Sequence, residues 1–212
     1  MVQLDPKALP GLASFRRRSQ ALAMLDAIVC ADWESRYYSF NASWGEGEAM
    51  GSMRNGSGDD WFVLFGSFGA AIKGLAHETP IAGDKAFAAE VQRQVPRAFS
   101  SFLTEPAFSM DWLSYCYWRE PEAASWRKVV HPDPALALSD DGSAGHLALL
   151  LEPASSYEEF AKWYYELTLP IAAIESVYAH VPLTEVLGRS LNPEVTIAHA
   201  REAAAEIGYP VG

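Results

Sequence analysis

The sequence predicts an α+β fold: an antiparallel sheet covered by an N-terminal helix and a C-terminal set of helices. Three observations support this fold class. Four short segments separated by glycine-bearing turns lie within residues 36–76, and the first and third of them are rich in aromatic residues. A helical apolar pattern precedes them, and several helix-start signals follow residue 154. Because strands and helices are segregated along the chain, we expect residues 1–212 to form a single α+β domain.

The segment before the sheet, residues 12–33, has the pattern of an amphipathic helix. Its apolar residues recur at spacings of three, four and seven: Phe15, Leu22, Leu25, Val29 and Trp33. This spacing gathers them into one stripe, and we expect that stripe to face the sheet. Trp33, at the end of the stripe, and Trp61 are both expected in the core.

The sheet is predicted to begin as a four-strand antiparallel meander. The first strand ends at Gly45–Gly47, the second ends at Asn55–Asp60, and Gly69 lies in the third turn. Connections this short join antiparallel neighbours. Residues 61–65 are apolar throughout, which predicts a strand covered on both faces. Residues 70–75 form the fourth strand.

Beyond the meander, the sequence predicts one helix and one to three further strands. Asp84 is expected to cap a helix over residues 86–95, because Asp accepts hydrogen bonds from the first free N–H groups of a helix. The additional strands are expected at three aromatic or apolar segments: residues 115–118, 126–130 and 146–151.

The C-terminal part is predicted to be helical. Ser155 and Ser156 each precede a glutamate by three residues, which is the capping-box pattern. Three more helices are predicted, at residues 171–180, at residues 183–191, and from Asn192-Pro193 to Gly208.

Composition restricts the compartment. Half of the residues are apolar, which is enough for a substantial core. No apolar run approaches the roughly 20 residues that span a bilayer, and the first residues lack the apolar block of a signal peptide. Cys30 and Cys116 lie far apart in the sequence. We expect two free thiols in a reducing compartment, with a disulfide as the alternative, and therefore a cytoplasmic protein.

The net charge of −11 is unevenly distributed along the chain. Residues 1–132 hold 15 acidic and 13 basic residues, whereas residues 133–212 hold 12 acidic and three basic residues, a balance of −9. An acidic surface repels nucleic acid and anionic membranes and attracts basic proteins. The alternative is an ordinary solvated acidic face. The residues expected to contact a basic partner are Asp140, Asp141, Glu158, Glu159, Trp163, Tyr165 and Glu166.

Catalytic motifs are absent from the sequence. The five histidines never pair at the spacing of a zinc helix, no Gly-x-Ser-x-Gly elbow occurs, and Gly56-Ser57-Gly58 lacks the lysine of a phosphate-binding loop. We therefore expect no metal and no cofactor. One constellation could support acid–base chemistry, because it flanks the ends of neighbouring strands: Arg54, Asp59, Asp60, His77 and Glu78. Turn formation is the alternative role for these residues.

Several short motifs resemble those of an uncharacterised bacterial protein family. They lie at residues 38–41, 52–60, 72–74, 77–78, 102–108, 116–119 and 207–210. The resemblance spans most of the chain, and the run Met53-Arg54-Asn55-Gly56-Ser57-Gly58-Asp59 is the most specific part. It implies no reaction and no catalytic residue.

Two functions are therefore expected from the sequence. The first is a non-enzymatic binding protein, because small, acidic, motif-poor bacterial proteins resemble by analogy the immunity proteins that mask the active site of a toxin. The second is a small hydrolase or nucleotide-handling enzyme with its site at the sheet rim around Arg54, Asp59 and His77.

Overall fold

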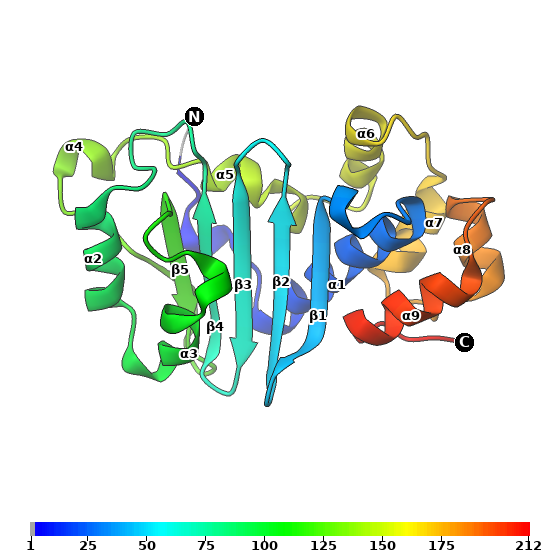
Figure 1. The fold of residues 1–212 in the computed structure, drawn as a ribbon, viewed down its shortest axis with the longest axis horizontal. Helices are drawn as coiled ribbons and strands as arrows, with labels where there is room; N and C mark the ends of the chain where they lie inside the picture. Colours follow the sequence, from blue (N-terminus) through cyan, green and yellow to red (C-terminus); the bar gives the residue numbers. More distant parts are fainter. Residues whose placement is uncertain (1–2) are drawn as a thin grey trace.

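A computed structural model describes residues 3–212, which form one six-stranded antiparallel sheet with helices on both faces (Figure 1). The order of the strands in the sheet follows their order in the chain. The strands are β1 (Tyr38–Gly45), β2 (Glu48–Arg54), β3 (Asp60–Gly66), β4 (Gly69–Leu75), β5 (Tyr115–Arg119) and β6 (Arg127–Lys128). The α+β class and the four-strand meander are confirmed, and two of the three further strands predicted after it are present.

The central strand β3 shows why the sheet needs two covers. Successive side chains point to opposite faces, so Trp61 and Val63 lie on one face while Leu64 lies on the other. All three are buried. The continuous apolar run of this strand is thus explained by a hydrophobic cluster on each side of the sheet.

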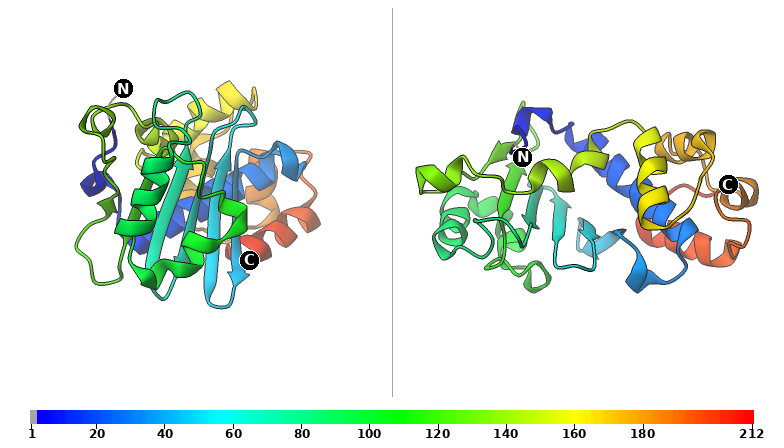
Figure 2. Two further views of the ribbon diagram at one scale, coloured as in Figure 1. Left: turned by 60° about the vertical axis from the view of Figure 1, so that its left-hand side comes forward. Right: turned by 90° about the horizontal axis from the view of Figure 1, so that it is seen from above.

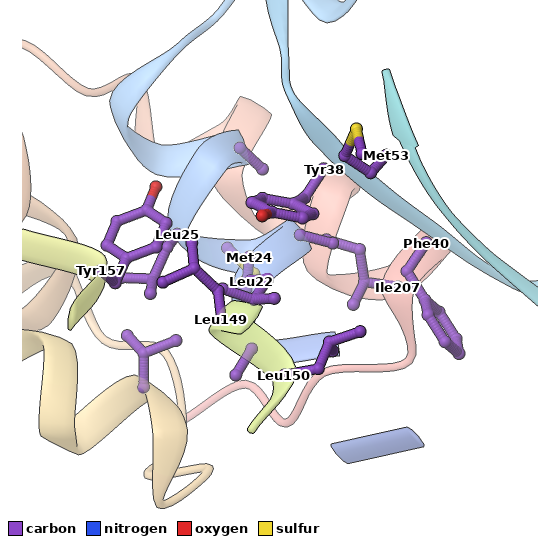
Figure 3. Close-up of a cluster of buried hydrophobic side chains, with 14 of the residues drawn as sticks. Leu22, Met24, Leu25, Tyr38, Phe40, Met53, Leu149, Leu150, Tyr157 and Ile207 are labelled. Atoms are coloured by element: carbon purple, nitrogen blue, oxygen red, sulfur yellow. The ribbon is translucent and has the colours of Figure 1, made fainter. Parts of the chain in front are cut away.

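The first face is covered by α1 (Leu12–Val29), which crosses behind the sheet in Figure 1. Phe15, Leu22 and Leu25 of the predicted stripe are inaccessible to solvent, but burial is not confined to one stripe. All residues from 19 to 28 are buried, because the C-terminal helices also pack against α1. The three stripe residues belong to the same cluster as Phe40 and Tyr38 of β1. Figure 3 shows Leu22 and Leu25 in this cluster. The same cluster takes in the C-terminal helices, which are α6 (Ser155–Tyr164), α7 (Ile171–Tyr178), α8 (Glu185–Leu191) and α9 (Ile197–Ile207).

The second face is covered by a shorter helical layer, seen on the other side of the sheet in Figure 2. It contains α2 (Lys85–Gln94), η3 (Arg97–Phe99), α3 (Ser100–Thr104) and η4 (Pro106–Phe108). Asp84 caps α2 as predicted, since its carboxylate accepts a hydrogen bond from the Phe87 N–H. Phe87, Phe99 and Phe102 fill this second cluster.

The first helix ends earlier than predicted, and Trp33 is not in the core. Asp32 accepts a hydrogen bond from the Glu34 N–H and starts a separate turn, η2 (Trp33–Ser35). Trp33 is 48% exposed, and the Arg54 guanidinium lies over its ring at 4.5 Å. Trp61, in contrast, is buried as expected.

Residues 146–151 are helical rather than extended. They include the end of α5 (Ser143–His146) and η5 (Ala148–Leu150). Two other short helical segments are α4 (Pro134–Ala137) and η1 (Pro6–Ala8). The Asp141 side chain accepts a hydrogen bond from the Ser143 N–H, which tightens the turn before α5. Ala and Leu favour helices, so local preference and this turn together outweigh the apolar run that resembled a strand.

Two predicted helix starts are also wrong. Neither Ser155 nor Ser156 caps α6, which begins without a side-chain hydrogen bond at its N-cap. The last helix begins at Ile197 instead of Pro193. Asn192 is used elsewhere, because its amide donates to the Ile28 carbonyl oxygen and so joins the C-terminal part to α1. Gly208 ends α9 in the left-handed conformation, as predicted.

Cys30 and Cys116 are both free thiols. Burial raises the pKa of each thiol above its ordinary value. Within residues 3–212, no helix combines the length and apolar character that crossing a membrane requires.

Candidate functional site

The rim site lies at the end of the sheet where β2 and β4 finish and β3 begins. Because these strands are antiparallel neighbours, the turn before β3 meets the segment after β4, and Arg54 pairs with Asp60 in the strand register. Asp59, at the end of that turn, is the residue that joins the surrounding loops.

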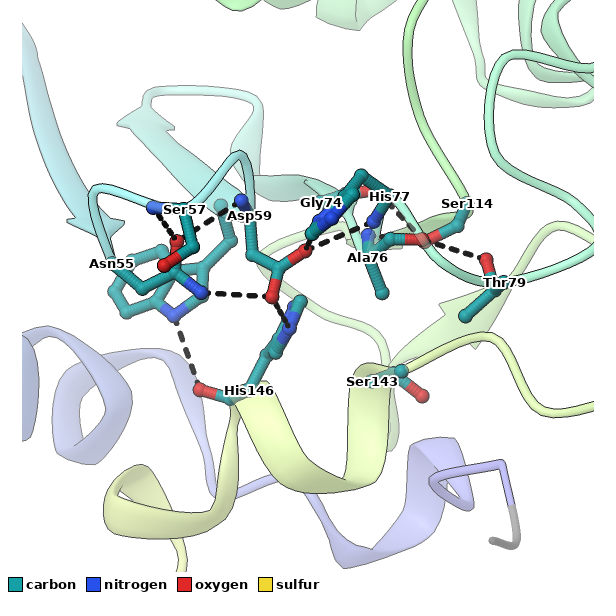
Figure 4. Close-up of polar contacts among 12 residues, drawn as sticks. Asn55, Ser57, Asp59, Gly74, Ala76, His77, Thr79, Ser114, Ser143 and His146 are labelled. Carbon is teal, nitrogen blue, oxygen red and sulfur yellow. Dashed lines mark hydrogen bonds and ion pairs between the residues drawn. The ribbon is translucent and has the colours of Figure 1, made fainter.

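Asp59 holds three separate segments through its carboxylate (Figure 4). Oδ1 lies 2.7 Å from His77 Nδ1 and accepts the His77 backbone N–H at 2.9 Å. Oδ2 accepts the Asn55 amide at 2.8 Å and lies 3.5 Å from His146 Nε2. The carboxylate therefore bridges the turn before β3, the segment after β4 and the end of α5.

His146 extends this network into the core. Its Nδ1 lies 3.2 Å from the hydroxyl of Tyr115, a fully buried residue of β5. Gly74 of β4 makes this contact possible, since a Cβ at that position would lie 2.0 Å from Tyr115 Cζ. His146 and Tyr115 were not predicted as site residues. His146 falls in the segment that the sequence assigned to a strand, so its position became visible only in the folded chain.

Electrostatics favour an ionised Asp59 beside a neutral His146. Burial opposes the ionisation of Asp59, but hydrogen bonds from the backbone and ring of His77 outweigh burial and lower the pKa of Asp59. Burial lowers the pKa of His146, and the attraction of Asp59 opposes that shift only in part.

A pocket of about 360 Å³ adjoins this network. Asp59 and His146 line it, and Glu78, Thr79 and Asp140 complete its polar wall. Both ring nitrogens of His146 already face partners, and the exposed His77 does not line the pocket. The pocket therefore presents carboxylates, and among the described residues no imidazole nitrogen without a partner lines it.

The other predicted rim residues lie apart from the pocket. Arg54 stacks on Trp33, and Asp60 binds Lys73 Nζ at 2.7 Å. Lys73 is buried, and it also donates to the Trp112 carbonyl oxygen at 2.9 Å. Burial lowers the pKa of this lysine, although Asp60 opposes the shift. The structure thus brings Asp59 and His77 together, whereas the Arg54 guanidinium packs on Trp33.

The predicted partner residues divide into surface and core. Asp141 is buried, binds Lys128 Nζ at 2.5 Å and accepts a hydrogen bond from the Ser143 hydroxyl. It is therefore not available to a partner. Asp140 is half-buried at the pocket and accepts the Gly142 N–H.

The residues expected on α6 are also divided. Glu158 is 12% exposed and pairs with Lys162 at 2.5 Å, one turn along the helix. Tyr165 points inward, because its hydroxyl donates to the buried Asp26 carboxylate at 2.7 Å. Glu159, Trp163 and Glu166 remain exposed, and we refer to these three residues as the α6 surface.

Trp163 is 71% exposed although it adjoins a dense aromatic group. Its ring contacts those of Phe160 and Tyr164, and both of these rings contact Tyr37 beside β1. Glu159 lies one turn before Trp163 on the same face of the helix. The Trp163 ring thus packs on other aromatic side chains, and the Glu159 carboxylate lies on the same face of the helix.

No group of three or more His, Cys, Asp and Glu side chains suited to a metal ion occurs in residues 3–212. Comparison of the chain with family models, curated proteins and solved structures finds no match. Function must therefore be argued from the surfaces and contacts described above.

Proposed function

We propose that this protein is a non-enzymatic cytoplasmic binding protein that captures a basic protein partner through its acidic C-terminal part. We further propose that the partner is a bacterial toxin whose active site it covers, in the manner of an immunity protein. The observation that carries the proposal is Trp163, a large aromatic side chain that is exposed although it packs on the rings of Phe160 and Tyr164. Tryptophan is the residue type most enriched among those that dominate binding energy at interfaces.

The charge pattern supports a basic partner. The 12 acidic residues after position 132 face only three basic ones, and two of these bases pair with glutamates of their own helices, Lys162 with Glu158 and Arg189 with Glu185. The net charge of this part is therefore strongly negative. Such a field speeds the encounter with a positively charged surface and disfavours anionic partners.

The test uses two exposed tryptophans on different parts of the molecule. The wild-type chain and its variants are co-expressed with the product of the neighbouring gene, and both toxicity rescue and binding affinity are measured. We expect Trp163→Ala to weaken binding by about 30-fold, in line with loss of an aromatic hot spot. Trp112→Ala is the matched control, since Trp112 is 61% exposed but lies against α2. Equal affinity of wild type and Trp163→Ala, or an equal loss in both variants, would overturn the α6 surface.

The sheet rim offers a second candidate, a small hydrolase or nucleotide-handling enzyme. The observation in its favour is the pair of Asp59 and His77, in which a carboxylate orients an imidazole whose Nε2 has no hydrogen-bond partner among residues 3–212. Against nucleotides stands the pocket wall, because Asp59, Glu78 and Asp140 would repel phosphate groups. Turnover of a neutral ester or amide that is abolished in a folded His77→Ala variant would establish this candidate.

A further inference from the structure

A buried carboxylate joins α6 to the rest of the first face. Asp26 lies in α1 and is inaccessible to solvent. Its Oδ1 accepts the Tyr157 hydroxyl at 2.6 Å, and its Oδ2 accepts the Tyr165 hydroxyl and the Tyr38 backbone N–H, both at 2.7 Å. Tyr157 lies in the first turn of α6 and Tyr165 directly follows its last residue. One side chain thus ties both ends of α6 to α1 and to β1.

No cation compensates this carboxylate within the described part of the chain. The arginines of the region bond elsewhere: Arg18 donates to the carbonyl oxygens of Leu150 and Glu152, and Arg36 donates to those of Cys30 and Ala31. Arg36 also lies 2.8 Å from His199 of α9. The charged form of Asp26 therefore relies on hydrogen bonds alone.

The other titratable groups around Asp26 stay neutral at ordinary pH. They are the thiol of Cys30, directly after α1, and the tyrosines in or next to β1, α6 and α7, namely Tyr37, Tyr38, Tyr157, Tyr164, Tyr165 and Tyr178. Burial raises the pKa of every one of these groups, which keeps them protonated. Asp26 is thus the group whose charge changes inside this cluster.

Protonation of Asp26 preserves its contacts. A protonated Oδ1 can donate to the Tyr157 hydroxyl, which reverses the direction of that hydrogen bond, while Oδ2 still accepts from Tyr165 and Tyr38. Tyr165 remains fixed because its hydroxyl also accepts the Tyr37 N–H at 3.2 Å. Burial raises the pKa of Asp26 to about 6, and the hydrogen bonds from Tyr157, Tyr38 and Tyr165 offset burial only in part.

We propose that Asp26 is a positioning residue that holds α6, and with it the α6 surface, and that ionisation of this carboxylate loosens the docking of α6. The role of the α6 surface in partner binding rests on the proposed function. The effect of Asp26 on the docking of α6, which we call the Asp26 latch, does not. When α6 undocks, Asp26 meets water and its pKa falls toward the ordinary value. The docked state therefore binds a proton more tightly, so docking is strongest at low pH and weakens as the pH rises toward 7.

Hydrogen exchange of the full chain at pH 5, 6, 7 and 8, corrected for the intrinsic rate, measures this docking without any partner. With a pKa near 4 undocked and about 6 docked, the protection of the α6 amides should fall about tenfold between pH 5 and pH 7 and then level off. The amides of α2 on the opposite face serve as the internal control. Constant α6 protection across this range would overturn the proposal.

Variants separate Asp26 from the histidines, which also titrate in this range. Asp26→Asn mimics the protonated side chain, since its amide can donate to Tyr157 while its oxygen accepts from Tyr165 and Tyr38. We expect α6 protection in this variant to be independent of pH and to exceed that of wild type at pH 8. Tyr165→Phe should reduce α6 protection, whereas Tyr164→Phe, which removes no hydrogen bond to Asp26, should not. A wild-type pH profile in Asp26→Asn, or equal effects of the two tyrosine variants, would refute the latch. Because none of these readouts needs a partner, a failed toxin-rescue experiment leaves this test unaffected.

Discussion

At the scale of single residues, the rim shows how one carboxylate can organise several loops. Asp59 accepts hydrogen bonds from an asparagine side chain, a backbone N–H and an imidazole, and it faces a second histidine. Asn55 closes the turn in return by accepting the N–H groups of Ser57 and Asp59. These contacts give Asp59 a structural role that needs no catalysis.

We predict that Asp59→Ala destabilises the fold by about 2 to 3 kcal/mol, because three donors lose a charged acceptor. His77→Ala should cost less than about 1 kcal/mol, since its ring is exposed and its backbone N–H can still bond Asp59. Denaturant unfolding of both variants measures the difference. A larger loss in His77→Ala would show that the ring, and not the carboxylate, holds the loops.

The pH dependence of this contribution has a defined sign. The folded pKa of Asp59 is lowered, so its stabilisation is fully present above the unfolded pKa of about 3.9 and is lost as the pH falls through the folded pKa. Asp26 contributes in the opposite sense, because its pKa is raised. Acid unfolding of Asp59→Asn should accordingly lack part of the wild-type loss of stability below about pH 4.

At the scale of elements, β3 is an interior strand of the sheet. It is hydrogen-bonded to β2 on one side and to β4 on the other, and a hydrophobic cluster covers each face. The strand β6, with two residues paired to β5, lies at the edge of the sheet. Opening β3 requires separation of strands on both sides, whereas β6 can fray locally.

We expect the amides of residues 62–65 to be among the slowest in the protein to exchange with solvent, because they open only with the sheet as a whole. The amides of β6 should exchange faster by several orders of magnitude. Residue-resolved hydrogen exchange at one pH provides the comparison. Rapid exchange in residues 62–65 would contradict the central position of β3.

At the scale of the whole molecule, the part of the chain that carries the acidic charge packs against the N-terminal part. The acidic residues concentrate after position 132, yet the helices that carry them pack on the N-terminal helix α1 and on β1. The most acidic part of the chain is thus mounted on the most extensively buried helix. The charged surface is thus supported by well-packed helices.

We predict that reversing Glu159 and Glu166 to Lys slows association with a basic partner and weakens the salt dependence of the association rate, because exposed rim charges act mainly on the encounter. Stopped-flow association at several salt concentrations measures both effects. The double reversal of Glu120 and Glu122 to Lys, in the turn after β5, is a control of equal net charge. If the control variant slows association as strongly as the reversal of Glu159 and Glu166, net charge alone steers the partner. The α6 surface would then not be the binding site that the prediction requires.

By itself, the sequence determined the elements whose signals are local. The meander follows from its glycine-bearing turns, the α2 start follows from Asp84, and the burial of Phe15, Leu22 and Leu25 in α1 follows from their spacing. Each of these patterns depends on neighbours within a few residues, so it can be recognised before the chain folds. The acidic C-terminal part is likewise a property of composition.

The tertiary structure alone decided which polar residues meet and which remain on the surface. Asp26 is one residue of an apolar helix in the sequence, and only packing brings Tyr157 and Tyr165, more than 130 positions away, onto its carboxylate. The same long-range packing buries Asp141, turns Tyr165 inward and joins His146 to Asp59. Such contacts are set by the docking of distant elements around a shared core, and no local pattern in the chain encodes which partners will meet.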